Sequence, residues 1–270
     1  MSNDRLLTII KEKNKSEIIQ MLETDGKIKT LSFFAEVLDK RSYFTLDSEG
    51  EIKRKELNFI LPIFAFSGDF DYLAYSVINF SDLREREKIS SINRFSNIDI
   101  PKLKEKLMKT LSNGNLDFSK RYGKELFLRD REEFYKTVLE FSLLGDAKSL
   151  KPLLVLSFKK LFENKEYEEN VFFLLISYLT KYRDNFYFYE NCEKDDSIVE
   201  LEKLKESVIF NKELLESKEG LEILSTLKAL EMYNFKNFDK YLSKIAVEMR
   251  MLKNLTALDE TTKKLSAAFL

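Results

Sequence analysis

Glycine and proline are scarce in this chain, which contains only seven glycines and three prolines in 270 residues. β-Sandwiches and α/β folds need many tight turns, and such turns depend heavily on these two residues. Leucine, lysine and glutamate, which favour helix, are abundant instead. The scarcity of turn residues therefore predicts an all-α fold.

The clearest pair of helices is expected at 134–158. Phe134 and Phe141 lie two helical turns apart, which places them on one face of the first helix. Gly145 stands where a helix end favours a residue with positive φ, and Asp146 follows as a cap for the next helix. Neither helix can bury its apolar face within the pair alone, so we expect the pair to stack on neighbouring helices.

A second copy of this pattern is found at 57–80. When Gly68 is aligned with Gly145, Asp69 matches Asp146 and the apolar positions of the following helix agree. The alignment favours a duplicated helix–turn–helix unit. Chance similarity between two helical hairpins is the alternative.

The stretch 144–154, Leu-Gly-Asp-Ala-Lys-Ser-Leu-Lys-Pro-Leu-Leu, resembles the turn and second helix of a HEAT-type repeat. The resemblance covers only the two hairpins at 57–80 and 134–158, which are not adjacent repeats. It implies an α-solenoid-like fold, an irregular stack of antiparallel helix pairs. Proteins of this architecture mostly act as scaffolds and binding surfaces.

Only one segment has a strand pattern, near 43–52, and it predicts either a small β-hairpin or an ordered loop there. The rest of the chain is predicted to form a single elongated helical domain over 1–270. The 115–125 segment is expected to be a loop, and a hinge is therefore predicted near 113–125.

The absence of histidine excludes several kinds of catalytic site. It removes His-ligated zinc, Ser-His-Asp chemistry and the commonest acid–base group near neutral pH. Cys192 is the only cysteine, which excludes an internal disulfide and a multi-cysteine metal site. No Gly-rich phosphate loop or serine nucleophile motif is found. We therefore expect no enzymatic activity, no cofactor and no metal.

The charges of the chain are almost balanced, with 45 basic and 46 acidic residues. The formal net charge of −1 gives no overall attraction to nucleic acid or to an anionic membrane. Apolar runs such as 171–176 are too short to span a bilayer, and the charged N-terminal stretch does not suit a signal peptide. These features predict a soluble, cytoplasmic protein without a membrane partner.

Basic residues form the first candidate binding surface. Lys102, Lys106 and Lys109 follow one helix face, and Arg121 and Lys124 come shortly after them. The face suits phosphates of RNA or DNA, or an acidic protein surface. A solvated helix face explains the same residues without any ligand, and we regard nucleic acid as the less favoured partner.

Acidic residues form a second candidate, because carboxylate oxygens are suitable ligands for divalent cations. Their spacing matches no calcium loop, and the glycine that such a loop needs is missing. A solvated loop is therefore the favoured interpretation. The residues concerned are Glu190, Glu193, Asp195, Asp196, Glu200 and Glu202.

An aromatic cluster is the third candidate, and it consists of Tyr182, Phe186, Tyr187, Phe188 and Tyr189. Four consecutive aromatic residues cannot all face one core from a single helix. The segment either folds back into its own core or exposes rings that anchor a partner, since aromatic residues are typical of interface hot spots.

These observations together predict a non-enzymatic scaffold or adaptor. It would bind another protein, or a second copy of itself, through its helical surface and the aromatic cluster. One alternative is a nucleic-acid-associated protein that uses the basic face. Another is a proteinaceous inhibitor or regulator of a different enzyme.

Overall fold

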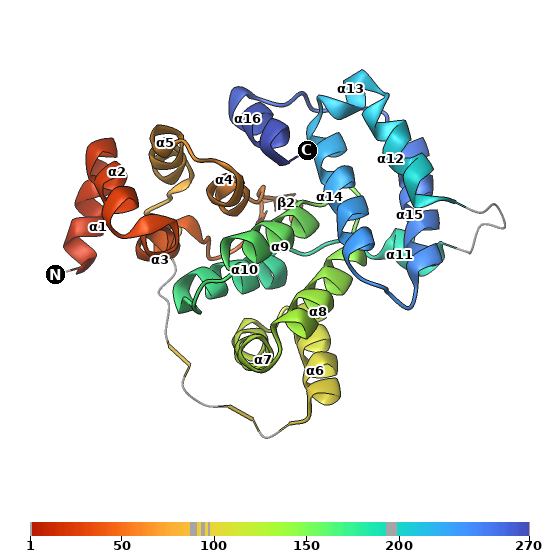
Figure 1. The fold of residues 1–270 in the computed structure, drawn as a ribbon, viewed down its shortest axis with the longest axis horizontal. Coiled ribbons are helices and arrows are strands. Elements are labelled where there is room, and N and C mark those ends of the chain that lie inside the picture. The colour runs from red at the N-terminus through yellow and green to blue at the C-terminus, as the bar shows by residue number, and fades with distance from the viewer. Residues whose placement is uncertain (1, 87–90, 93–94, 97, 193–198, 270) are drawn as a thin grey trace. The chain divides into compact units, whose positions relative to one another are not determined.

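The computed structural model covers residues 1–270 and describes all of them except 1, 87–90, 93–94, 97, 193–198 and 270 (Figure 1). Of the described residues, 67% are helical. Across the described residues there are sixteen helices, which pack in pairs, and one two-stranded antiparallel sheet. The prediction of an all-α fold with a small β-hairpin is confirmed.

Contacts within the chain divide it into two compact units. Unit 1 consists of Met1–Arg131 and Ser157–Arg183, and unit 2 consists of Glu132–Leu156 and Asp184–Leu270. Each unit is therefore built from two separate stretches of sequence. The segment 113–125 lies wholly inside unit 1.

Unit 1 contains the first seven helices, one later helix and the sheet. Their bounds are α1 (Ser2–Lys11), α2 (Lys15–Thr24), α3 (Gly26–Leu38), β1 (Phe44–Leu46), β2 (Ile52–Arg54), α4 (Ile60–Phe66), α5 (Phe70–Phe80), α6 (Ile100–Ser112), α7 (Leu116–Arg129) and α10 (Glu169–Lys181). Helix α9 (Leu150–Leu161) contributes its last turn.

Helix α10 is the centre of unit 1, in contact with α3, α6 and α7. All ten of its residues from Val171 to Thr180 are buried, so the helix has no solvent-facing side along this length. Phe172 belongs to a cluster of rings that also includes Phe127 and Phe158, with ring centroids between 5.4 and 6.0 Å apart. Aromatic packing of this kind provides much of the core of unit 1.

Unit 2 contains nearly all of α8 (Arg131–Leu143), the start of α9, and the helices that follow residue 184. The bounds of these later helices are α11 (Tyr187–Asn191), α12 (Leu201–Ile209), α13 (Lys212–Leu215), α14 (Lys218–Met232), α15 (Phe238–Arg250) and α16 (Glu260–Phe269). Helix α14 packs against α12 and α13, and α11 packs against α15.

The prediction of a loop at 115–125 is wrong, because α7 begins at Leu116. The side chain of Asn115 accepts a hydrogen bond from the amide of Phe118 at 3.2 Å, and it thereby caps this helix. Leu126 and Phe127 on the same helix are fully buried. Asn115, a residue type typical of loops, here caps the start of a helix that packs in the core.

The Gly145 turn also differs from its prediction. Among the described residues, the glycines with positive φ are Gly26, Gly50 and Gly114, so Gly145 is not in the left-handed region. A Cβ atom on Gly145 would lie 2.7 Å from the carboxyl carbon of Asp184, so close packing is what requires a glycine. Helix α9 starts only at Leu150, and Asp146 is therefore too early to be its cap.

The matching turn at 66–70 follows the expected pattern more closely, since the side chain of Asp69 accepts from the amide of Tyr72 at 3.1 Å and caps α5. The two aligned turns thus have different local structures. The HEAT-like arrangement remains a prediction.

Candidate functional site

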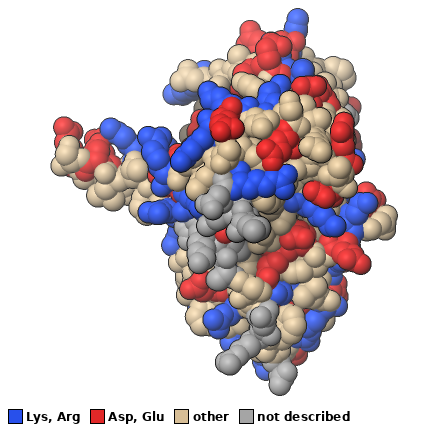
Figure 2. Space-filling model, turned by 90° about the vertical axis from the view of Figure 1, so that its left-hand side faces the viewer, with Lys and Arg blue, Asp and Glu red and all other residues tan. Residues whose placement is uncertain are grey.

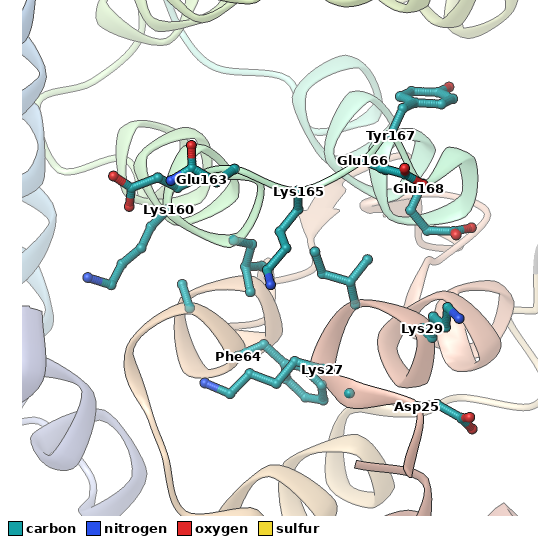
Figure 3. Close-up of a pocket in the computed structure, with 15 residues that line it drawn as sticks. Asp25, Lys27, Lys29, Phe64, Lys160, Glu163, Lys165, Glu166, Tyr167 and Glu168 are labelled. Carbon is teal, nitrogen blue, oxygen red and sulfur yellow. The ribbon is translucent and has the colours of Figure 1, made fainter. Parts of the chain in front are cut away.

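A groove in unit 1 has a volume of about 610 Å³ (Figure 3). It lies between the start of α3, the end of α4, the end of α9 and the loop that joins α9 to α10. Apolar side chains line part of it, and charged side chains surround them. The apolar residues are Ile28, Phe64, Ala65 and Leu161; the basic ones are Lys27, Lys29, Lys160 and Lys165; the acidic ones are Asp25, Glu163, Glu166 and Glu168.

Two backbone turns shape the groove. At the α2–α3 junction Gly26 has a φ of +79°, which lets α3 begin immediately after α2 ends. In the α9–α10 loop Asn164 has a φ of +56°, a conformation that asparagine tolerates better than most residues. The loop after Asn164 carries Lys165 over the groove.

Four lysines line the groove, and among the described residues none of them has a carboxylate partner; Lys29 lies on the side of Asp25 (Figure 3). Lys165 extends from its loop toward Lys27 and Phe64, and Lys160 lies on the same side as Lys27 (Figure 3). Across the described residues, Lys27, Lys160 and Lys165 form no ion pair within 4 Å. We call these three residues the groove lysines.

The electrostatics of Lys27 show that the groove lysines influence one another. Burial lowers the pKa of Lys27, and the positive charge of Lys160 lowers it further. The Lys27 ammonium donates to the carbonyl of Ser67 at 2.5 Å, which holds it in place. The Lys160 ammonium lies 5.2 Å from the centre of the Phe66 ring. A bound anion would relieve this repulsion between like charges.

Carboxylates line the groove as well. Asp25 and Glu168 lie away from Lys27 and Lys160, whereas Glu163 lies beside Lys160 (Figure 3). A carboxylate oxygen of Glu168 accepts from the hydroxyl of Ser32 at 2.8 Å, which fixes its position. Charges of both signs therefore surround the apolar part of the groove.

The predicted aromatic cluster is divided between the two units. Tyr182 belongs to unit 1, where its ring centroid lies 6.3 Å from that of Tyr43. Phe186 and Tyr189 belong to unit 2, and both rings are held by the chain itself. Phe186 packs on Phe141 at 6.4 Å.

Tyr189 and Tyr187 have opposite environments within the one-and-a-half-turn helix α11. The Tyr189 ring stacks on Tyr241 at 5.4 Å, and its hydroxyl accepts from the side chain of Asn237 at 3.0 Å. Tyr187 is 58% exposed and touches the half-buried ring of Phe188 edge-on. Of the four rings at 186–189, Tyr187 is the one that is exposed.

The predicted basic face is only partly formed. Lys102, Lys106 and Lys109 are exposed on α6, and Arg121 is exposed on α7. Lys124 does not belong to this face, because it is buried in an ion pair with Glu169 at 2.5 Å.

Two aromatic rings lie between the exposed cations of α6 and α7. Phe118 and Tyr122 are stacked with centroids 5.8 Å apart. Lys106 lies 5.7 Å from the Tyr122 ring, and Arg121 lies 5.7 Å from the Phe118 ring. We call these four residues the α6–α7 surface.

The predicted acidic segment can be followed only in part. Glu193, Asp195 and Asp196 lie outside the described residues. Glu200 and Glu202 pair with nearby lysines of α12, at 3.1 and 3.7 Å, and Glu190 is exposed. Where the structure describes the chain, no group of three or more acidic or cysteine side chains is arranged to hold a metal ion.

Unit 2 contains a buried set of charges that stabilises the loop between α8 and α9. Lys244 donates to the carbonyls of Leu143 and Gly145, and Glu248 accepts from the amide of Ala147 at 2.7 Å. These contacts satisfy backbone groups that the loop would otherwise bury without partners. Their role is therefore explained by the fold.

A second ion pair joins the same region to the chain after residue 183. Lys151 and Asp184 lie 2.8 Å apart, with side chains 1% and 3% exposed. The Lys151 ammonium also lies 4.8 Å from the Phe141 ring. Neither charge reaches solvent, so we assign the pair to folding rather than to ligand binding.

The sequence did not identify the groove lysines as a site. They come from 27, 160 and 165, and only the fold brings the first to the other two. The nearest signal was the Asp25–Gly26 turn, which predicts a helix boundary but not a lysine cluster. Lys160 and Lys165 flank a short polar turn of a common type.

Charges of both signs are interspersed over the face drawn in Figure 2. Recognition on such a surface depends on small local clusters rather than on a long-range field. Comparisons with protein-family models, with curated proteins and with solved structures found no match. Where the structure describes the chain, none of its helices combines the length and apolar character needed to cross a bilayer.

Proposed function

We propose that this chain is a non-catalytic scaffold or adaptor that binds a short segment of another protein in the groove of unit 1. The segment would contain an acidic residue beside an apolar one. The observation that carries this proposal is the arrangement of the groove lysines, three side chains that line one concave site and have no carboxylate partner among the described residues.

The carboxylates that line the groove favour a protein segment over a polyanion as its ligand. Asp25 and Glu168 would repel the continuous phosphates of a nucleic acid. A peptide can place a carboxylate near Lys160 and Lys165, an apolar side chain on Phe64, and a polar or basic group near Glu168. Binding then needs little rearrangement, because the groove is already formed.

Tyr187 is a second element of the proposed protein-binding function. Its ring is exposed while Phe186 and Tyr189 anchor the segment from which it projects. An exposed ring on an anchored turn loses little conformational entropy when a partner covers it. The HEAT-like stacking and the cytoplasmic location are further parts of this proposal, and an enzyme inhibitor or regulator would be one form of it.

Selection from a display library of random peptides tests the groove directly. The whole chain is the bait, and the comparison is with the double variant Lys160→Glu, Lys165→Glu. We expect the natural chain to enrich peptides with Asp or Glu next to an apolar residue, and the double variant to lose that enrichment. The double variant Lys236→Glu, Lys253→Glu, at exposed positions outside the helices of unit 2, controls for the same change of net charge.

Enrichment that is the same with both baits would contradict the proposal. Enrichment of basic peptides by the natural chain would do so as well, because the groove lysines would repel them. Circular dichroism and thermal melting of each bait confirm that the variants are folded.

The α6–α7 surface supports a second candidate function, the binding of single-stranded nucleic acid. Phe118 is 44% exposed and stacked on Tyr122, and Lys106 and Arg121 lie over the two rings. Bases stack on aromatic rings while cations hold the phosphates. A titration of labelled RNA and DNA at increasing salt tests this candidate. Affinity that falls steeply with salt and is lost in Arg121→Glu supports it, and absence of binding at low salt contradicts it.

A further inference from the structure

The β-hairpin of unit 1 exposes an apolar face. In its register Leu46 lies opposite Ile52, and Phe44 lies opposite Arg54. Phe44, Leu46 and Ile52 therefore share one face. These three side chains are 45%, 64% and 66% exposed, so the described chain leaves this face largely uncovered.

The hairpin is nevertheless well anchored at both ends. At its base Tyr43 is buried against Tyr178, with ring centroids 5.9 Å apart. At its tip a carboxylate oxygen of Asp47 accepts from the amides of Glu49 and Glu51, at 3.0 and 2.9 Å. A hairpin fixed in this way presents a rigid strand to its surroundings.

The outer edge of β2 has backbone groups available for pairing. The amide of Lys55 donates to the carbonyl of Tyr43 at 2.8 Å, and the amide of Asp47 donates to the carbonyl of Glu51 at 3.0 Å. In an antiparallel pair, inward-pointing and outward-pointing residues alternate. Glu51, Lys53 and Lys55 therefore point toward β1. The N–H and C=O groups of Ile52 and Arg54 point away from it, which leaves an open strand edge.

Acidic and basic residues lie at equal distances on the two sides of Ile52. The acidic residues precede Ile52 and the basic residues follow it. The sequence from 49 to 55 reads Glu-Gly-Glu-Ile-Lys-Arg-Lys. We propose that two copies of this chain pair antiparallel along β2, with a two-fold axis at Ile52. Glu51 of each copy then lies opposite Lys53 of the other.

The outward-pointing groups restrict the register. They can pair only with outward-pointing groups, so Ile52 lies opposite either Ile52 or Arg54 of the second copy. The second of these registers places Lys53 opposite Lys53, which is unfavourable. The first places Glu51 opposite Lys53 twice and brings the two Ile52 side chains together. Charge complementarity therefore selects the register centred on Ile52.

Ion pairs already formed within one chain limit which charged residues can contact the second copy. Lys55 is held by Glu85 at 2.6 Å and stays with it. Lys53 lies 3.1 Å from Asp47, but its side chain is exposed and free to turn toward a second copy. The Glu51–Lys53 contact is therefore the main charge pair, and it occurs twice because of the symmetry. The paired hairpins form a four-stranded sheet whose apolar residues lie on one face.

Charge exchange tests the pairing, with sedimentation velocity over a range of concentrations as the measurement. We expect the natural chain to dimerise reversibly. Glu51→Lys and Lys53→Glu should each weaken dimerisation at least about tenfold, because two like-charge contacts replace two opposite ones. The double variant Glu51→Lys, Lys53→Glu should recover the dimer. An equimolar mixture of the two single variants should form a heterodimer, since each then meets its complement.

Two proline variants test the backbone hydrogen bonds between the paired β2 strands, one as the test and one as its matched control. Ile52→Pro removes an amide on the outer edge of β2, and Leu46→Pro removes the corresponding amide on the outer edge of β1. We expect the first to abolish the dimer and the second to retain it. A natural chain that stays monomeric at all concentrations overturns the proposal. A dimer that is equally insensitive to Glu51→Lys and Ile52→Pro overturns it as well.

Discussion

At the scale of single residues, Asp39 joins two helices of unit 1. It follows α3, and one of its carboxylate oxygens accepts from the hydroxyl of Ser177 at 2.6 Å and from the ammonium of Lys181 at 3.0 Å. Burial raises the pKa of Asp39, while Lys181 and Ser177 favour its charged form. The carboxylate is therefore kept in a poorly solvated position by two partners from α10.

Replacement of Asp39 should be costly. Asp39→Ala removes a buried carboxylate that pairs with Lys181, whose side chain is 11% exposed, and we expect the free energy of unfolding to fall by about 3 kcal/mol. Urea denaturation measures this change. Asp71→Ala is the control, because its pair with Lys15 is exposed and should contribute less than about 1 kcal/mol. If both variants lose the same free energy of unfolding, the buried Asp39 pair stabilises the fold no more than the exposed Asp71 pair, which would contradict this prediction.

Glu248 predicts a dependence of stability on pH. Burial raises its pKa above the ordinary value of 4.5, although Lys244 and the amide of Ala147 favour the charged form. The native state then holds the proton more tightly than the unfolded state. Its contribution to stability is complete below pH 4.5 and is lost as the pH rises through the native pKa.

Glu248→Gln keeps an acceptor for the amide of Ala147 but removes the titration. We expect the stability of the natural chain relative to this variant to fall between pH 4.5 and neutral pH. Urea denaturation at several pH values gives the difference. A difference that rises with pH would show that the ion pair outweighs burial at this site.

At the scale of elements, α11 combines anchoring and exposure within five residues. Tyr189→Ser removes a ring that stacks on Tyr241, so we expect a loss of about 2 kcal/mol in the free energy of unfolding. Tyr187→Ser should change it by less than about 0.5 kcal/mol, because that ring is mostly exposed. Thermal melting compares the two. If Tyr187→Ser costs as much as Tyr189→Ser, the exposed ring belongs to the core.

Elements whose signals are local were predictable from the sequence. The apolar run at 171–176 lies in the buried helix α10, and the strand-like residues near 43–52 form the hairpin with its Asp47 turn. Helix α7 was missed because its cap, Asn115, also reads as a turn residue. Local pattern alone does not separate a cap from a loop.

Sites that depend on distant partners were not predictable in the same way. Lys124 was predicted to belong to a basic surface, but Glu169 of α10 pairs with it in the folded chain. The groove lysines come from two segments far apart in sequence, and only the folded chain brings them to one concave site. Burial of a charge is decided by tertiary contacts, which single-sequence periodicity does not contain.

At the scale of the whole molecule, the proposed functions use separate surfaces. The groove and the β2 edge both belong to unit 1 but share no residue, and Tyr187 belongs to unit 2. Variants of one surface therefore leave the others intact. A chain that lost peptide binding but kept its dimer would locate recognition in the groove.

In the proposed function, the groove lysines bind a carboxylate of a protein segment. A charge-exchange cycle tests this contact, with affinity measured by titration calorimetry for one selected acidic peptide and for its Glu→Lys counterpart. The two baits are the natural chain and Lys160→Glu, Lys165→Glu. We predict that either reversal alone weakens binding at least about tenfold, and that the two reversals together restore it. If the doubly substituted chain binds the Glu→Lys peptide no better than the two separate losses of affinity predict, the lysines do not bind this carboxylate.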